Sequence, residues 1–223
     1  RNTMYNPADN LEFFGRNINL DITHRCVLQC PRCMRQFKPG LHKRGHDISV
    51  EDYTKICKAW HTVLLCGQMG DPIYHTKLHD LLDVNIEQKN RLQISTNGHG
   101  KKDAWWDKSF AKTREMKSHE WIFGIDGLPK DSHVHRVNQN GEAVFEKMVE
   151  GAKVGNNILW QYIVFKYNEN DIEEATQLAR DNNIKFVLLE SSRWLGEDDP
   201  LRPSKHYIDR TLGREIEMLG TQV

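Results

Sequence analysis

The sequence predicts an α/β protein in which mostly parallel strands form an open, partial (β/α)6 barrel of the TIM-like kind. Short apolar runs that favour strands alternate with amphipathic segments that favour helices. The first strand begins near residue 18 and the sixth near residue 184, so the repeat is about 33 residues, the length of one strand–helix unit. Six units are fewer than the eight that close a barrel, which predicts an open one.

The individual elements follow from local patterns. The first predicted strand alternates polar and β-branched residues, and the second is an apolar run that ends at Gly67. Ser49 is placed to cap the first helix, with Asp52 at the third position beyond the cap. The predicted strands are 18–23, 62–66, 92–96, 121–125, 159–165 and 185–189. The predicted helices are 50–59, 77–88, 103–116, 142–154, 171–182 and 205–219.

Length and charge limit the classes of protein to which the chain can belong. The 223 residues suit one core domain with small appendages, and we expect an N-terminal extension (1–17), a core (18–190) and a C-terminal helical appendage (191–223). Lys plus Arg and Asp plus Glu both number 31, so nucleic acid is not indicated as a partner. The sequence contains no apolar run of the roughly 20 residues that span a bilayer and no apolar leader, so no membrane association is expected.

The cysteines give the strongest chemical signal. All five lie in the first third of the chain, and Cys26, Cys30 and Cys33 follow the first strand with the spacing C-x3-C-x2-C. Cysteine thiolates are the usual ligands of a 4Fe–4S cluster, and three of them leave one iron without a protein ligand. Clustered free thiols also indicate a reducing compartment, so we expect a cytoplasmic protein.

Polar or glycine-rich turns follow five of the predicted strands: THRC, GQMGDP, STNG, GIDG and ESSR. The carboxyl ends of parallel strands meet at one rim of a barrel, and catalytic sites of barrels lie there. The turns and the cysteine loop are therefore expected to share one site.

Because these turns follow the cysteine loop in a characteristic order along the chain, the sequence resembles the radical S-adenosylmethionine superfamily over about residues 18–189. The resemblance implies an enzyme that holds a 4Fe–4S cluster and S-adenosyl-L-methionine, cleaves the latter reductively, and uses the 5′-deoxyadenosyl radical to abstract hydrogen from a substrate. It also implies that Cys26, Cys30 and Cys33 are the metal ligands. The segment His133-Val-His135-Arg136 is similar to the branch with peptide-maturing enzymes and the molybdopterin-pathway cyclase.

The same resemblance implies the cofactor-binding residues. In the family, the turn after the second strand holds the methionyl amino group of S-adenosylmethionine. Arg136 is our candidate for binding the carboxylate of the cofactor. Arg32 replaces the usual aromatic residue that packs near the adenine. Gly124 stands where the family often has a carboxylate-binding serine. The expected cofactor-binding residues are Gly67, Gln68, Met69, Gly70, Asp71, Asn97, Asp126, Arg136 and Arg32.

A competing interpretation makes the cysteine loop a non-catalytic zinc or redox binding module. Zinc needs a fourth ligand, for which His24, Cys57 and Cys66 are available. We instead interpret Cys57 and Cys66 as buried, inert thiols. The basic segment 35–46 is expected to be a solvated loop, with a lid over the site as its alternative.

Other residues have less specific expectations. His133 and His135 are spaced as a metal pair, although loop histidines are more often solvated. Trp106 is expected to be buried, and residues 191–193 are expected either to line the site or to cap the sixth strand. The substrate is left open between a peptide or protein and a small molecule, and the resemblance implies an electron donor such as flavodoxin or ferredoxin.

Overall fold

The structure is a computed structural model that describes residues 17–37, 40 and 45–207. Six strands form a single sheet in which the spatial order is the chain order, and each strand pairs in parallel with the next. The expected α/β fold with an open parallel sheet is therefore confirmed. The strands are β1 (Asn17–Leu20), β2 (Thr62–Leu65), β3 (Arg91–Thr96), β4 (His119–Gly124), β5 (Ile158–Val164) and β6 (Lys185–Glu190).

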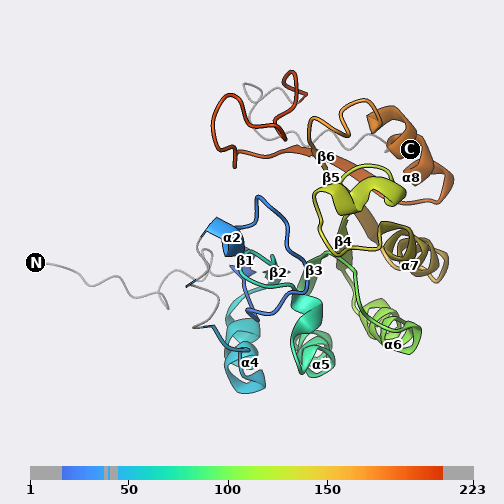
Figure 1. Ribbon diagram of the computed structural model, residues 1–223. Coiled ribbons are helices and arrows are strands. Elements are labelled where there is room, and N and C mark those ends of the chain that lie inside the picture. Colours follow the sequence, from blue (N-terminus) through green and yellow to red (C-terminus); the bar gives the residue numbers. More distant parts are fainter. Residues whose placement is uncertain (1–16, 38–39, 41–44, 208–223) are drawn as a thin grey trace, which may run out of the picture.

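The helices lie between consecutive strands, and Figure 1 shows the long ones side by side around the outside of the curved sheet. This arrangement covers one face of the sheet and leaves the strand ends accessible from the rim. The long helices are α4 (Val50–Ala59), α5 (Leu78–Gln88), α6 (Asp103–Arg114), α7 (Gly141–Lys153) and α8 (Ile172–Asp181). Three short ones follow strands at the rim: α2 (Met34–Phe37), η2 (Pro72–Tyr74) and η3 (Pro129–Val134).

Local capping explains where several helices begin. The side chain of Ser49 accepts a hydrogen bond from the Asp52 N–H at the start of α4, as the sequence predicts. The side chain of Asn140 accepts from Ala143 N–H at the start of α7, although the sequence pattern had placed the first helical residue one position later. Of the predicted final helix, 205–219, residues 205–207 are not helical and the rest lies outside the described residues.

Large aromatic side chains fill the core between the sheet and helices α6 and α7. Trp106 is 1% exposed, as expected, and packs against Phe110, Trp121 and Phe123 with ring centroids 5.2 to 5.5 Å apart. Gly151 lets α7 approach this cluster, because a β-carbon there would lie 2.8 Å from the Phe110 ring. The packing fixes the strands, and with them the loops at the rim.

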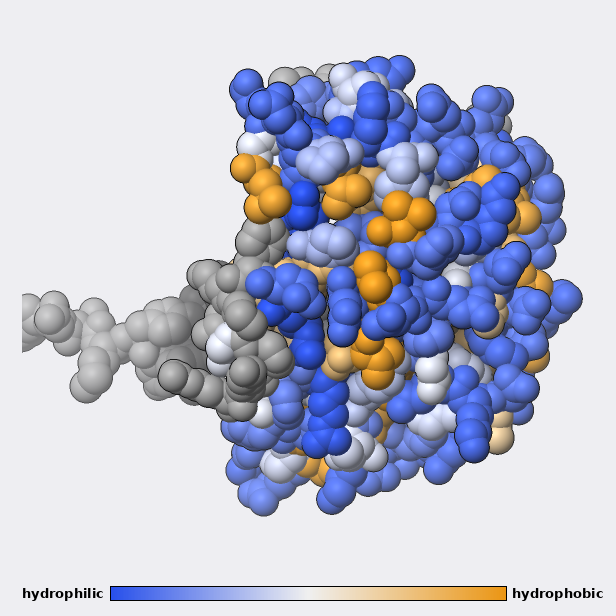
Figure 2. All heavy atoms as spheres, viewed as in Figure 1, coloured by the Kyte–Doolittle hydropathy of each residue, from blue (hydrophilic) through white to orange (hydrophobic). Residues whose placement is uncertain are grey.

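The outer surface is predominantly hydrophilic on the face in Figure 2, where hydrophobic residues form small separate groups. Among the described helices, none combines the length and the apolar character needed to cross a membrane. The segment after β6, residues 191–207, is irregular, and it returns toward the loop that follows β1 (Figure 1). This return places part of the segment next to the cysteine loop.

Candidate active site

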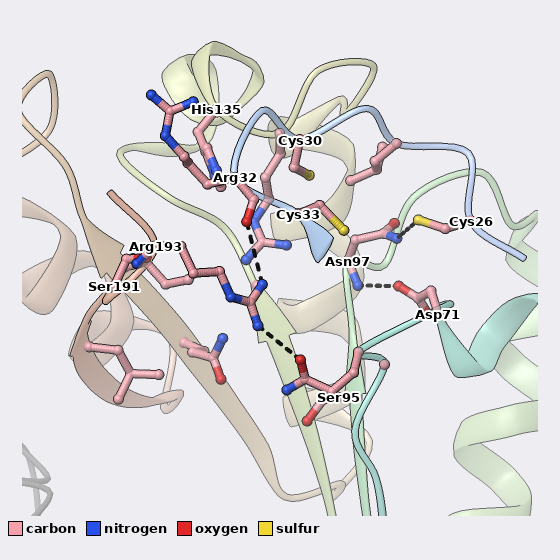
Figure 3. Close-up of a pocket in the computed structure, with 18 of the residues that line it drawn as sticks. Cys26, Cys30, Arg32, Cys33, Asp71, Ser95, Asn97, His135, Ser191 and Arg193 are labelled. Atoms are coloured by element: carbon pink, nitrogen blue, oxygen red, sulfur yellow. Dashed lines mark hydrogen bonds between the residues drawn. The ribbon is translucent and has the colours of Figure 1, made fainter. Parts of the chain in front are cut away.

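A cavity of about 350 Å³ opens at the carboxyl ends of the strands. Its lining comes from the loops after β1, β2, β3, β4 and β6 and from the end of β5, so all six strand ends contribute. Figure 3 shows the three cysteines of the β1 loop on one side of it, near Asn97. The cavity thus lies where the sequence leads us to expect a site, at the turns that follow the strands.

The cysteine loop is held by its own backbone and by the β4 side of the cavity. Cys33 N–H donates to the Cys30 carbonyl at 3.0 Å, and Gln29 N–H donates to the Val137 carbonyl at 3.1 Å. Leu28, 5% exposed, anchors the loop between the first two cysteines. These contacts turn Cys26, Cys30 and Cys33 toward one cavity, which all three line.

The electrostatic surroundings of two of these thiols are unusual. Burial raises the pKa of Cys26 to about 11 and that of Cys30 to about 12. Arg35 acts in the opposite direction on Cys26, and Arg136 does so on Cys30, because each guanidinium favours the thiolate. The Asn97 side chain also donates to the Cys26 sulfur at 3.6 Å. A cation and a hydrogen-bond donor beside buried thiols suit thiolates that ligate a metal.

The three thiols have the donor chemistry of a 4Fe–4S cluster site. Among the described residues, no three His, Cys, Asp or Glu side chains converge on a position for one metal ion. Cys26, Cys30 and Cys33 border a common space, as the protein ligands of such a cluster would. Zinc would need four donors meeting at one point.

The turn after β2 is pressed against the cysteine loop. Gly67 has a φ of +63°, which favours glycine. A β-carbon on Gly70 would lie 2.2 Å from the Thr23 carbonyl oxygen, so only glycine permits this approach. Asp71 N–H then donates to the Arg25 carbonyl at 2.8 Å. The glycine pattern of the turn is thus explained by contact between two loops.

Asp71 connects the turn to β3 through its buried carboxylate. It accepts hydrogen bonds from Asn97 N–H at 2.6 Å, from the Thr96 hydroxyl at 2.8 Å and from Ile73 N–H at 3.1 Å. Burial raises the pKa of Asp71 above its usual range. Asn97, in turn, reaches Cys26, so Asp71 positions the residue that contacts the sulfur (Figure 3).

On the β4 side of the cavity, Asp126 connects neighbouring residues as Asp71 does on the β2 side. Its carboxylate lies 2.9 Å from Arg136 Nε and 2.9 Å from His135 Nδ1, and it accepts from Ile163 N–H at 3.1 Å. Burial alone would raise the pKa of Asp126, but the charge of Arg136 and the bond from His135 outweigh it and lower the pKa. Asp126 is therefore an ionised anchor that sets the position of two cavity residues.

Gly124 and Arg136 are complementary in shape. A β-carbon on Gly124 would lie 2.3 Å from Arg136 Nη2, so the guanidinium occupies the space of the missing side chain. The glycine, where the superfamily that the sequence resembles often has serine, thus leaves room for Arg136 at the cavity. The sequence showed both residues but not that the Arg136 guanidinium lies against Gly124.

His135 is a cavity residue that the sequence patterns did not indicate. The expectation that loop histidines are solvated holds for His133, which is exposed, and is wrong for His135, which is 6% exposed. Its ring packs on Phe165 with centroids 4.1 Å apart, and its Nε2 is buried without a hydrogen-bond partner in the described part of the chain. The sequence feature that could have indicated its burial is Asp126 in the preceding turn, an acidic residue able to pair with the histidine ring.

The segment after β6 closes the side of the site that the open sheet leaves uncovered. Arg32 donates two hydrogen bonds to Asp199, at 3.0 and 2.7 Å, across 167 positions of sequence. Arg193 donates to Gln68 at 2.8 Å and to the Arg32 carbonyl at 3.4 Å (Figure 3). Residues 191–193 all line the cavity, which agrees with the first of their two expected roles.

Most of the expected site residues share the cavity. Met69 and Asp126 lie behind its lining and reach it through neighbours. Cys57 is buried as expected, at 3% exposure, whereas the interpretation of Cys66 as a buried thiol is wrong, because the end of β2 turns it into the cavity wall and leaves it partly exposed. The expected residues that line the cavity are Cys26, Cys30, Cys33, Arg32, Gly67, Gln68, Gly70, Asp71, Asn97 and Arg136.

Comparison with known proteins gives matches among solved structures alone. No protein-family model matches the sequence, and no curated protein does. SuiB from Streptococcus suis superimposes with a TM-score of 0.67 at 16% identity, over 89% of this chain and 44% of SuiB. The structure anSMEcpe with bound AdoMet gives 0.61 at 13% identity, over 87% of this chain and 54% of that one.

Methylornithine synthase (PylB) also superimposes with a TM-score of 0.61 at 13% identity, over 94% of this chain and 68% of that one. SuiB has likewise been solved with S-adenosylmethionine bound. The chain spans less than half the length of SuiB. At these identities the likeness concerns the fold. The chain therefore has the fold expected from its resemblance to the radical S-adenosylmethionine superfamily.

Proposed function

We propose that this chain is a radical S-adenosylmethionine enzyme, with Cys26, Cys30 and Cys33 holding a 4Fe–4S cluster. The observation that carries the proposal is that three free thiols from one loop line the same cavity as the glycine turn after β2 and Asn97. A fold shared with structures solved with bound S-adenosylmethionine supports it. When bound, the cluster and S-adenosylmethionine supply a 5′-deoxyadenosyl radical that removes hydrogen from the substrate.

The chain's own residues bind and orient the cofactor in this proposal. The turn formed by Gly67, Gln68, Met69, Gly70 and Asp71 offers backbone carbonyls to the methionyl ammonium group. Asp71 holds this turn to β3 through its buried carboxylate, which keeps the carbonyls at the cavity edge.

Arg136 is proposed to receive the cofactor carboxylate, and Asp126 orients it. Asp126 engages Nε and Nη2 of the guanidinium, and Arg136 lines the cavity. A guanidinium fixed on one edge can still offer its other donors to a carboxylate.

Arg32 is proposed to stack on the adenine. Asp199 binds the edge of the Arg32 guanidinium through two hydrogen bonds and holds its plane in one orientation. The flat faces are not used by these bonds, and a fixed plane loses less entropy on stacking.

The substrate is proposed to be a peptide or protein. SuiB has been solved with its precursor peptide SuiA and anSMEcpe with a peptide, which is consistent with this class. A one-electron donor such as flavodoxin or ferredoxin and a cytoplasmic location complete the proposal, since a reduced cluster needs both an electron source and a reducing environment.

Metal content after anaerobic reconstitution tests the proposal. The protein should contain about four iron and four sulfide per chain. Cys30→Ala should lose them, because one lost thiolate leaves the cube with two protein ligands, whereas Cys57→Ala should keep them, because Cys57 lies outside the cavity lining. Stoichiometric zinc without iron would instead support the binding-module alternative.

A further inference from the structure

Arg35 holds an unusual position for a charged side chain. Its Nη1 donates to two backbone carbonyl oxygens, that of Met69 at 2.8 Å and that of His24. No carboxylate in the described part of the chain forms an ion pair with it. The cation is thus bound by two neutral oxygens that belong to two different loops.

The close contact of those loops creates the pair of carbonyls. Gly70 lies against the Thr23 carbonyl, where a β-carbon would come to 2.2 Å, and Asp71 N–H bonds to the Arg25 carbonyl at 2.8 Å. This contact aligns the β1 loop with the β2 turn and brings the carbonyls of His24 and Met69 within reach of one nitrogen atom. Two converging carbonyl oxygens form a site for a compact N–H-bearing cation.

The position of Arg35 relates this site to the cavity. Arg35 lines the cavity, whereas His24 and Met69 do not. The guanidinium therefore covers the two carbonyls on the cavity side. Arg35 is partly exposed and follows the last cysteine on the short helix α2, so its long side chain has solvent into which it can withdraw.

We propose that Arg35 competes with the primary ammonium group of the ligand for the backbone carbonyls of His24 and Met69. The inference rests on the proposed function, which places the methionyl ammonium of S-adenosylmethionine at the β2 turn. Arg35 then sets the affinity for the cofactor, because each binding event must replace the bonds that its guanidinium makes. A ligand without an ammonium group gains nothing from this exchange.

Calorimetric titration of the anaerobically reconstituted protein tests the competition with two probes. S-adenosylmethionine carries the ammonium group, and 5′-deoxy-5′-methylthioadenosine lacks it. Arg35→Met removes the competing charge and keeps an apolar stem, so it should tighten S-adenosylmethionine binding roughly tenfold and leave the second probe unchanged. Arg35→Lys, which supplies another competing cation, should stay within about threefold of wild type.

Arg25→Met is the matched control, because the Arg25 side chain is 48% exposed, pairs with Asp47 and does not line the cavity. Its affinity for both probes should equal that of the wild type. Unchanged or weaker S-adenosylmethionine binding by Arg35→Met, with iron and sulfide retained, would overturn the competition. Binding of S-adenosylmethionine by neither wild type nor Arg35→Met would refute the proposed function itself and this inference with it.

Discussion

The ion pair between Arg32 and Asp199 should contribute measurably to stability. Both side chains are nearly inaccessible, at 10% and 0% exposure, so solvent screens the pair little. The hydrogen bonds from Arg32, the largest cause, lower the pKa of Asp199 from 3.8 to about 2. At 1.36 kcal/mol per unit, this shift corresponds to about 2 kcal/mol of folding free energy.

Asp199→Asn tests this value, because it removes the charge and keeps the size of the side chain. At neutral pH we expect a loss of about 2 kcal/mol in urea unfolding and a fall of about 4–8 °C in Tm. Asp198→Asn, a change at the exposed neighbouring residue, should have little effect.

The pH dependence gives a second check on the same pair. A carboxyl group whose pKa is lowered by folding stabilises the protein fully above the unfolded pKa, and loses that contribution as the pH falls toward the folded pKa. The stability difference between wild type and Asp199→Asn should therefore be constant above about pH 5 and shrink toward pH 2. A difference no larger than that of Asp198→Asn, or one that does not shrink in acid, would refute the reasoning.

Two further changes address the cavity. Gly124→Ala should destabilise the protein by about 1–3 kcal/mol, because the added β-carbon would overlap the Arg136 guanidinium and force it to shift against its buried carboxylate partner. Thermal unfolding measures this loss. The control is Gly40→Ala, whose added β-carbon meets no atom of the described residues within 4 Å, and equal Tm values for the two variants would contradict the account. Arg32→Ala should weaken S-adenosylmethionine binding by about tenfold in calorimetry, from lost stacking, and unchanged affinity would exclude Arg32 as the adenine contact.

Periodic patterns predicted the sheet well because each strand and helix depends mainly on local sequence. The cap at Ser49 gave the bounds of α4 as observed, and the short apolar run before Gly67 gave β2 to within a residue. The one-turn helix α2 was not predicted, since four residues carry no periodicity.

Side-chain partners at the site were harder to predict because they are distant in sequence. Nothing in the sequence around Arg32 indicates that its partner is Asp199, which lies 167 positions away. The apolar run around Cys66 correctly indicated a strand but could not show that its last residue turns toward the cavity. His135 was assigned to solvent because Phe165, which covers its ring, comes from another strand end.

The central claim is that the three cysteines of the β1 loop make this chain a radical S-adenosylmethionine enzyme. Its most direct test is the formation of 5′-deoxyadenosine by the anaerobically reconstituted protein with dithionite and S-adenosylmethionine. The account predicts that the wild type and Cys57→Ala form this product and that Cys30→Ala does not. No product from a wild type loaded with about four iron and four sulfide, or equal product from Cys30→Ala, would contradict it.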